Sequence, residues 1–117
     1  MAKTRIRISC EWGAVAADLA NNAACHALLL MLPISVKMRD HLRQEKTGYL
    51  PTPLPEMARK VDFAAGTLGL WDSDNFVIYY RKGRVPSPGI VILGNVSGDV
   101  SLFDRPGTVT VHIEQIP

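Results

Sequence analysis

The sequence lacks the marks of several common classes of protein. It has two cysteines, Cys10 and Cys25, which are too few for a disulfide framework and do not have the spacing of a metal-binding motif. Lysine and arginine total 13 against 11 acidic residues, a net charge of +2, and they are scattered rather than clustered. Nucleic-acid-binding domains usually carry a basic stripe or patch. We therefore expect no metal, no disulfide and no nucleic-acid partner.

Long hydrophobic runs are also missing. The longest apolar run, residues 23–32, is well short of the roughly 20 residues that a membrane span needs, and it ends at Pro33. Near the N-terminus, Arg5 and Arg7 alternate with apolar residues instead of preceding an apolar block, so we expect no secretory signal. The expectation is a reduced, cytoplasmic protein that does not enter a membrane.

Phosphate loops and catalytic motifs are absent as well. The nine glycines include no G-x-x-x-x-G-K segment, and the three histidines stand far apart, without the cysteine or carboxylate spacing of a metal site. We therefore expect no cofactor and assign no catalytic residue. What is present is an ordinary globular composition, 47% apolar and 21% charged in 117 residues, which suffices for a core. The prediction is one domain over residues 1–117.

Alternation of apolar and polar residues predicts strands at both ends of the chain. Residues 4–10 alternate strictly, and residues 13–19 repeat the pattern after a glycine, which predicts a hairpin. Residues 34–39 and 108–114 alternate in the same way. Asp40 breaks the third pattern, because a continued strand would place it on the apolar face. Either the strand ends or bulges there, or the carboxylate is buried for a purpose; the pattern leaves both readings open.

One helix is predicted, over about residues 22–32. Asn22 is a good N-cap residue, alanine and leucine favour helix, and Pro33 prevents continuation. The helix is apolar nearly all round, which predicts that it is buried on most sides, capping or plugging a barrel. A short helical turn is predicted at about residues 99–104, with Asp99 as its cap.

Continuous apolar runs predict strands covered on both faces. Residues 67–71 and 75–80 flank a turn of Asp72 to Asn75, and residues 89–94 form another such run. Between them and the third strand, the pattern dissolves over residues 47–66, where three prolines exclude a central strand. A connection of this length is uncommon unless it is functional. Many short strands with one helix predict a mainly β, closed barrel.

Several motifs follow one another in a recognisable order. They are an "N-x-A…LLxxLP" helix at residues 22–33, Tyr49 before a proline-rich loop, "G-x-x-x-x-W" at 66–71, "FVIYY" at 76–80, "SPG" at 87–89, "LG" at 93–94 with Gly98, and "V-x-V-x-I-E" at 109–114. In this order the chain resembles an uncharacterised prokaryotic family with a cyclophilin-like barrel. The resemblance implies a small, distorted cyclophilin-like β-barrel with a helix closing one end. It implies no activity.

The first functional hypothesis is a binding module for a small molecule or peptide. Small barrels present pockets at their mouths, so we expect a site there, beside the 47–66 loop. Tyr49, Trp71 and Tyr80 offer apolar surface with polar tips, while Arg39 and Arg81 could receive an anion or a carbonyl. The alternative reading is that Trp71 and Tyr80 are core aromatics and both arginines are solvated.

Two other functions remain open. The resemblance to cyclophilins suggests isomerisation of X-Pro bonds, with Arg39 or Arg81 holding the carbonyl side, although the phenylalanine–histidine–arginine run and the glutamine–glycine signature of true cyclophilins are absent. The third hypothesis is a self-assembly domain whose edge strands pair between subunits, which would make it a homo-oligomer.

Overall fold

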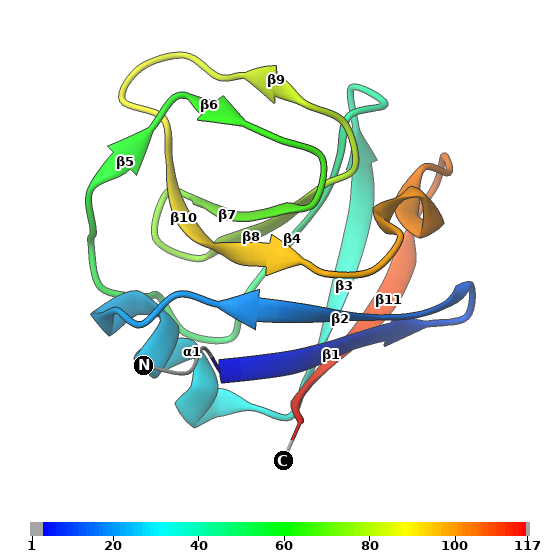
Figure 1. Ribbon diagram of the computed structural model, residues 1–117, viewed down its shortest axis with the longest axis horizontal. Helices are drawn as coiled ribbons and strands as arrows, with labels where there is room; N and C mark the ends of the chain where they lie inside the picture. The colour runs from blue at the N-terminus through cyan, green and yellow to red at the C-terminus, as the bar shows by residue number, and fades with distance from the viewer. Residues whose placement is uncertain (1–3, 117) are drawn as a thin grey trace.

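Eight antiparallel strands close into a barrel in the computed structural model, which describes residues 4–116 (Figure 1). The strands are β1 (Thr4–Cys10), β2 (Gly13–Leu19), β3 (Ile34–His41), β4 (Glu45–Tyr49), β7 (Thr67–Trp71), β8 (Asn75–Tyr79), β10 (Ile90–Val96) and β11 (Val109–Gln115). They follow the order β2-β1-β11-β3-β4-β8-β7-β10, and β10 pairs with β2 to complete the ring. The prediction of a mainly β, closed barrel is confirmed.

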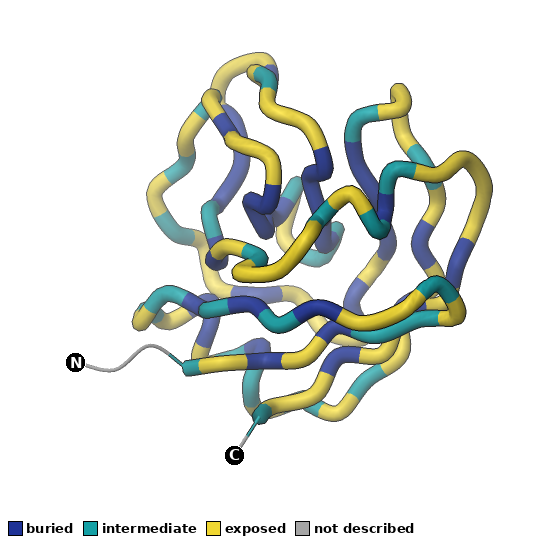
Figure 2. The backbone as a smooth tube through the Cα atoms, turned by 45° about the vertical axis from the view of Figure 1, so that its right-hand side comes forward, coloured by how far each residue is buried: buried dark blue, intermediate teal, exposed yellow. Residues whose placement is uncertain are grey.

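The first hairpin and the last strand form as their alternation predicts. Ile6 lies opposite Ala17 and Ile8 opposite Val15 in the pairing of β1 with β2, and all four side chains are buried inside the barrel. On β11 the residues predicted to face inward are buried as well, namely Val109, Val111 and Ile113. Figure 2 shows the resulting alternation of buried and exposed positions along these strands.

A second, smaller core lies outside the barrel wall. On β8, Phe76 and Ile78 belong to the interior core, whereas Val77 and Tyr79 pack outside with Phe63, and the Phe63 and Tyr79 rings stack with centroids 3.7 Å apart. The outer layer includes the small sheet of β6 (Asp62–Phe63) and β9 (Gly83–Arg84), while the short strand β5 (Arg59–Lys60) pairs with β10 at the edge of the main sheet. The prediction that the continuous apolar runs are covered on both faces is therefore correct.

The helix α1 (Ala23–Met31) caps one end of the barrel. Asn22 accepts a hydrogen bond from the Cys25 backbone N–H at 2.9 Å, as its N-cap role predicts. Burial is less complete than expected, because Leu30 on the outer side is 89% exposed. The predicted helical turn is η1 (Val100–Phe103), capped by Asp99. Among the described residues, no helix combines the length and hydrophobicity that crossing a membrane requires.

The region from 45 to 66 is more regular than its sequence suggests. Strand β4 begins at Glu45 and pairs with both β3 and β8, so the first residues of the predicted 47–66 loop belong to the barrel. Only the remainder, from Leu50 onward, leaves the barrel wall, and it contains β5 and β6. β4 escaped prediction because its inward-facing positions are Lys46 and Gly48 rather than large apolar residues.

Asp40 does not end the third strand. β3 continues to His41, and Asp40 lies on the inner face with Val36 and Met38, its side chain only 13% exposed. Of the two readings of this residue, the buried carboxylate is the correct one. Its partner is Lys46, which lies directly opposite in the pairing of β3 with β4.

Candidate functional site

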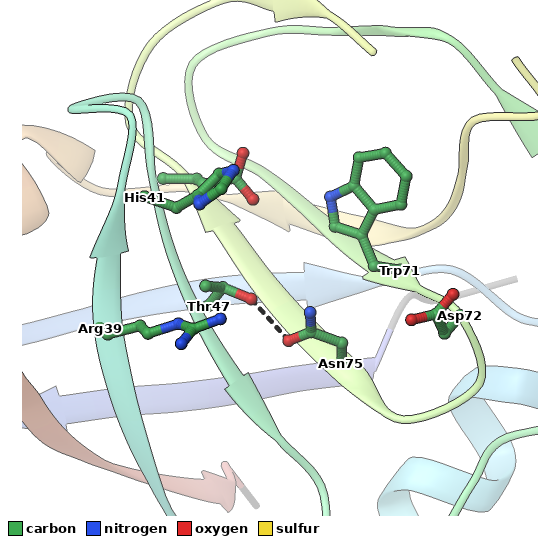
Figure 3. Close-up of a pocket in the computed structure, with 7 residues that line it drawn as sticks. Arg39, His41, Thr47, Trp71, Asp72 and Asn75 are labelled. Atoms are coloured by element: carbon green, nitrogen blue, oxygen red, sulfur yellow. Dashed lines mark hydrogen bonds between the residues drawn. The ribbon is translucent and has the colours of Figure 1, made fainter. Parts of the chain in front are cut away.

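The outer face of β3, β4 and β8 is hollowed into what we call the outer groove. It consists of two adjoining hollows that share Arg39, Thr47 and Asn75. The first, the polar hollow, has a volume of about 170 Å³ and is also lined by His41, Glu45, Trp71 and Asp72 (Figure 3). The second, the apolar hollow, has a volume of about 210 Å³ and is also lined by Lys37, Met38, Gly48, Tyr49 and Thr108.

Strand register brings the lining residues together. Arg39 lies opposite Thr47, and His41 opposite Glu45, in the pairing of β3 with β4. Asn75 lies opposite Tyr49 on one side and is paired on the other with β7. Because alternate residues of a strand share one face, these side chains all project from the outer surface of the sheet.

Hydrogen-bond donors dominate one side of the polar hollow. Thr47 donates its hydroxyl hydrogen to Asn75 Oδ1 at 2.5 Å, so the Asn75 amide N–H groups stay available to a ligand. Within residues 4–116, no ion pair engages the Arg39 guanidinium, which Figure 3 places beside Thr47. These groups can bind a carbonyl, a carboxylate or another oxygen acceptor.

Glu45 is the unusual residue of the polar hollow. Only 2% of its surface is exposed, and burial raises the pKa of its carboxyl to about 7, against the lowering effect of hydrogen bonds from Gln44 and Trp71. Gln44 Nε2 is 3.3 Å from Glu45 Oε1. No cation of the described chain forms an ion pair with this carboxyl group. Glu45 can therefore gain or lose a proton near neutral pH.

Tyr79 lies opposite Glu45 on the neighbouring strand β8. Its ring is fully buried, and its hydroxyl is the one buried side-chain polar atom of residues 4–116 that has no hydrogen-bond partner. Burial, together with the charge of Glu45, raises the pKa of this phenol. A carboxyl and an unpartnered hydroxyl thus lie together beneath the polar hollow, and such clusters mark functional sites more often than structural ones.

The barrel end opposite α1 is closed by a polar cluster rather than open as a pocket. Lys46 is fully buried and its ammonium group donates to Asp40 Oδ1 at 3.0 Å, to the Gly107 carbonyl at 3.2 Å and to the Arg105 carbonyl. Tyr80 donates its hydroxyl hydrogen to Asp40 Oδ1 at 2.5 Å. Although burial acts to raise the pKa of Asp40, hydrogen bonds from Tyr80 and Lys46 hold it below its ordinary value.

Three of the five residues singled out in the sequence meet in the outer groove. Arg39, Tyr49 and Trp71 line it. Tyr49 is 64% exposed to solvent. Tyr80 does not reach the groove, because it faces the barrel interior and binds Asp40. Arg81 lies near Tyr80 and pairs with Asp104 at 3.2 Å. The reading of Tyr80 as a core aromatic is thus the better one.

The expected site is one at the barrel mouth beside the 47–66 loop. Both hollows lie on the outer face of the sheet, and of that segment Thr47, Gly48 and Tyr49 line them. A neighbouring hollow of about 420 Å³, which includes Trp71 and Asp72, is lined by Glu56 and Arg59 of the same segment. Sequence reasoning missed the lining residues His41, Glu45, Thr47, Asp72 and Asn75. The only available signal was that Glu45, Thr47 and Tyr49 alternate along the sequence. This alternation indicates that they share one face of the sheet only after residues 45–49 have been identified as a strand.

The remaining reactive side chains form no second site. Cys25 is buried in α1, where its thiol donates to the Leu93 carbonyl at 3.1 Å and burial raises its pKa to about 11. Cys10 is a half-buried free thiol at the end of β1. Across the described part of the chain, no group of three or more histidine, cysteine and acidic residues is placed to hold a metal ion.

Comparison with known proteins agrees with this architecture. The sequence model of the cyclophilin-like family matches residues 8–114. The chain belongs to the cyclophilin-like family. Among solved structures, it is similar to a hypothetical protein from Archaeoglobus fulgidus, AF2241, with a TM-score of 0.74 and 14% sequence identity over 97% of this chain and 95% of that one. At that identity the likeness shows a shared cyclophilin-like fold. Among curated proteins, none matches the sequence.

Proposed function

We propose that this cyclophilin-like protein is a binding module whose outer groove takes a small molecule or a short peptide. One observation carries the proposal: the unpaired Arg39 guanidinium belongs to both hollows. A single ligand can therefore be held at Arg39 by an oxygen acceptor while it extends into the polar hollow on one side and the apolar hollow on the other.

The size and chemistry of the groove support an extended ligand. Each hollow alone is smaller than the roughly 300 Å³ at which ligand pockets usually begin, so a ligand of ordinary size must use both. The exposed Tyr49 ring gives the second hollow an apolar surface. Thr47 and Asn75 supply hydrogen bonds in the middle, as a peptide or an acylated small molecule requires.

The proposal is tested by an NMR titration of ¹⁵N-labelled protein with capped tetrapeptides, including several that contain Ala-Pro. We expect amide shifts in residues 37–39, 47–49 and 71–75. Arg39→Gln should weaken binding about 10-fold, since it removes a charge-assisted hydrogen bond. Arg81→Gln is the matched control, because Arg81 lies outside the groove, and it should leave affinity unchanged. Shifts confined to other surfaces, or equal losses in both variants, would contradict the proposal.

Isomerisation of X-Pro bonds is the second candidate function. It is favoured by the position of Arg39 beside an apolar hollow, since rotation about an X-Pro bond needs a site for the proline ring and a grip on the neighbouring carbonyl that is strongest for the twisted amide. The same samples test it: cis–trans exchange peaks should appear with the protein and vanish with Arg39→Gln. Self-assembly has less support, because the pairing of β10 with β2 removes the long sheet edges that subunits would share.

A further inference from the structure

We propose that the polar hollow binds a free amino group, placed against the Glu45 carboxyl, so that the ligand of the outer groove is an α-amino acid or a peptide with a free N-terminus. This inference rests on the proposed function and narrows its ligand class.

The first support is a buried carboxyl without a cation. Glu45 forms part of the hollow, yet it is 98% buried, and the side chains that hydrogen-bond to it in the described structure, Gln44 and Trp71, are uncharged. Lys46, its neighbour in sequence, points to the opposite face of the sheet and is committed to Asp40. A buried carboxylate is costly unless a cation and hydrogen bonds compensate for its lost hydration. An ammonium group from a ligand would provide both.

The second support is the separation of charge across the hollow. Figure 3 shows Trp71 and Asp72 on one side and Arg39 on the other, with Asn75 between them. The Asp72 carboxylate at the rim adds to the attraction that Glu45 exerts on an ammonium group. The opposite side carries donors for oxygen. An α-amino acid and the first residue of a peptide carry an amine and a carbonyl carbon on adjacent atoms, which matches this arrangement.

The third support is the position of the apolar hollow. A residue held by its amine at Glu45 and by its carbonyl at Arg39 has its side chain, or the next residue of a peptide, directed along the groove. Lys37, Tyr49 and Thr108 lie there. The same geometry favours a free amine over a blocked one in the polar hollow, because an acyl group placed against Glu45 supplies no cation.

Binding of an ammonium group at Glu45 should be coupled to release of the proton from the Glu45 carboxyl. His41 on β3, Tyr79 on β8, and Asp72 beyond β7 face Glu45 from the elements around it, and Asp40 acts on it through the sheet. Of these groups, Asp40 opposes ionisation of the Glu45 carboxyl through its charge. Since the pKa of Glu45 is about 7, an arriving ammonium group should displace about half a proton per site at pH 7.

The test uses the dipeptide Ala-Leu and its N-acetylated form, which differ only at the amine. We expect calorimetry at pH 7 to give at least about 10-fold tighter binding of Ala-Leu, with proton release measured from the dependence of the heat on buffer ionisation. Glu45→Gln should abolish both the preference and the proton release. Glu114→Gln, which changes an exposed glutamate of β11, is the matched control and should change neither.

Two further measurements make the result decisive. Because Glu45→Gln alters a buried position, Asp72→Asn serves as a second variant and should reduce the preference for the free amine without removing Glu45. The ¹³C signal of the Glu45 carboxyl should move toward its ionised position on addition of Ala-Leu. Equal binding of both dipeptides in the groove would overturn the inference and leave the proposed function standing. Absence of groove binding by these dipeptides and by the capped tetrapeptides would overturn both.

Discussion

Asp40 and Lys46 face each other inside the barrel, with 3.0 Å between Asp40 Oδ1 and Lys46 Nζ. Either residue without the other would be an unpaired charge at an inward-facing position. As a pair, they close the end of the barrel that α1 leaves open. Tyr80 and Arg43 complete the coordination of the Asp40 carboxylate. This cluster therefore fills that end of the barrel with paired charges and hydrogen bonds.

Removing the lysine should therefore destabilise the fold strongly. Lys46→Met leaves the Asp40 carboxylate without its buried cation and leaves the Gly107 and Arg105 carbonyls without a donor. Loss of one partner of a buried ion pair typically costs about 3–5 kcal/mol. Urea unfolding should reveal a loss of that order, whereas Lys82→Met at an exposed position should stay within about 0.5 kcal/mol of the original protein. A loss below about 1 kcal/mol for Lys46→Met would contradict the assignment.

Two adjacent tyrosines should respond in opposite ways to loss of their hydroxyl groups. The Tyr79 hydroxyl is buried without a partner, so Tyr79→Phe removes an uncompensated polar atom and should stabilise the protein by about 1 kcal/mol. Tyr80 donates to Asp40 and accepts a hydrogen bond from Arg43 at 3.0 Å, so Tyr80→Phe should cost about 1–3 kcal/mol. Thermal and urea unfolding of the two variants measures both. Destabilisation by Tyr79→Phe would indicate a hydrogen-bond partner for its hydroxyl.

Much of the barrel was predictable because the hydrophobic pattern of most strands shows which of their faces are buried. The hairpin of β1 and β2, the pair β7 and β8, and β11 each show the period or the continuous apolar run that their environment requires. The helix was predictable from Asn22 and Pro33, which mark its ends. Its exposed Leu30 was not, because a single apolar side chain on a surface carries no pattern.

What escaped prediction depends on pairs of residues distant in sequence or on opposite strands. Lys46 reads as a surface residue until the register of β3 with β4 places Asp40 opposite it. The same register brings His41 to Glu45 and Arg39 to Thr47. Because β4 was not predicted, about half of the residues that line the outer groove could not be predicted either. Tyr80 and Arg81 were chosen for their chemistry, but the alternation of β8 turns Tyr80 inward.

Closure of the barrel should depend on the small size of Gly94. At this position β10 shifts its register against β7 and begins to pair with β2, and an added Cβ would lie 2.1 Å from the Asp18 carbonyl oxygen. Gly94→Ala should therefore force the two strands apart at a cost of about 1–3 kcal/mol. Gly98→Ala is the control, since its nearest neighbour would lie at 3.4 Å, an ordinary contact distance. Equal stability of both variants in urea would show that the strands separate without cost.

The stability of the protein should depend on pH through Glu45. Its pKa rises from 4.5 to about 7 on folding, so the folded state binds the proton more tightly than the unfolded state does. The resulting stability is complete below about pH 4.5, falls as pH rises between the two values, and is lost above about pH 7. The full difference corresponds to about 3 kcal/mol. Glu45→Gln, which cannot ionise, should not show this fall.

The measurement is the difference in unfolding free energy between Glu45→Gln and the original protein, taken from urea titrations at intervals from pH 4 to pH 8. Other titrating groups, including Asp40 and the histidines, are common to both proteins and largely cancel in the difference. The difference should shift in favour of the glutamine variant as pH rises through the interval from 4.5 to about 7. A difference that stays constant over this range would mean that Glu45 is ionised in the folded protein throughout, with a cation that compensates for its burial. In that case the polar hollow would hold no vacant place for an amine.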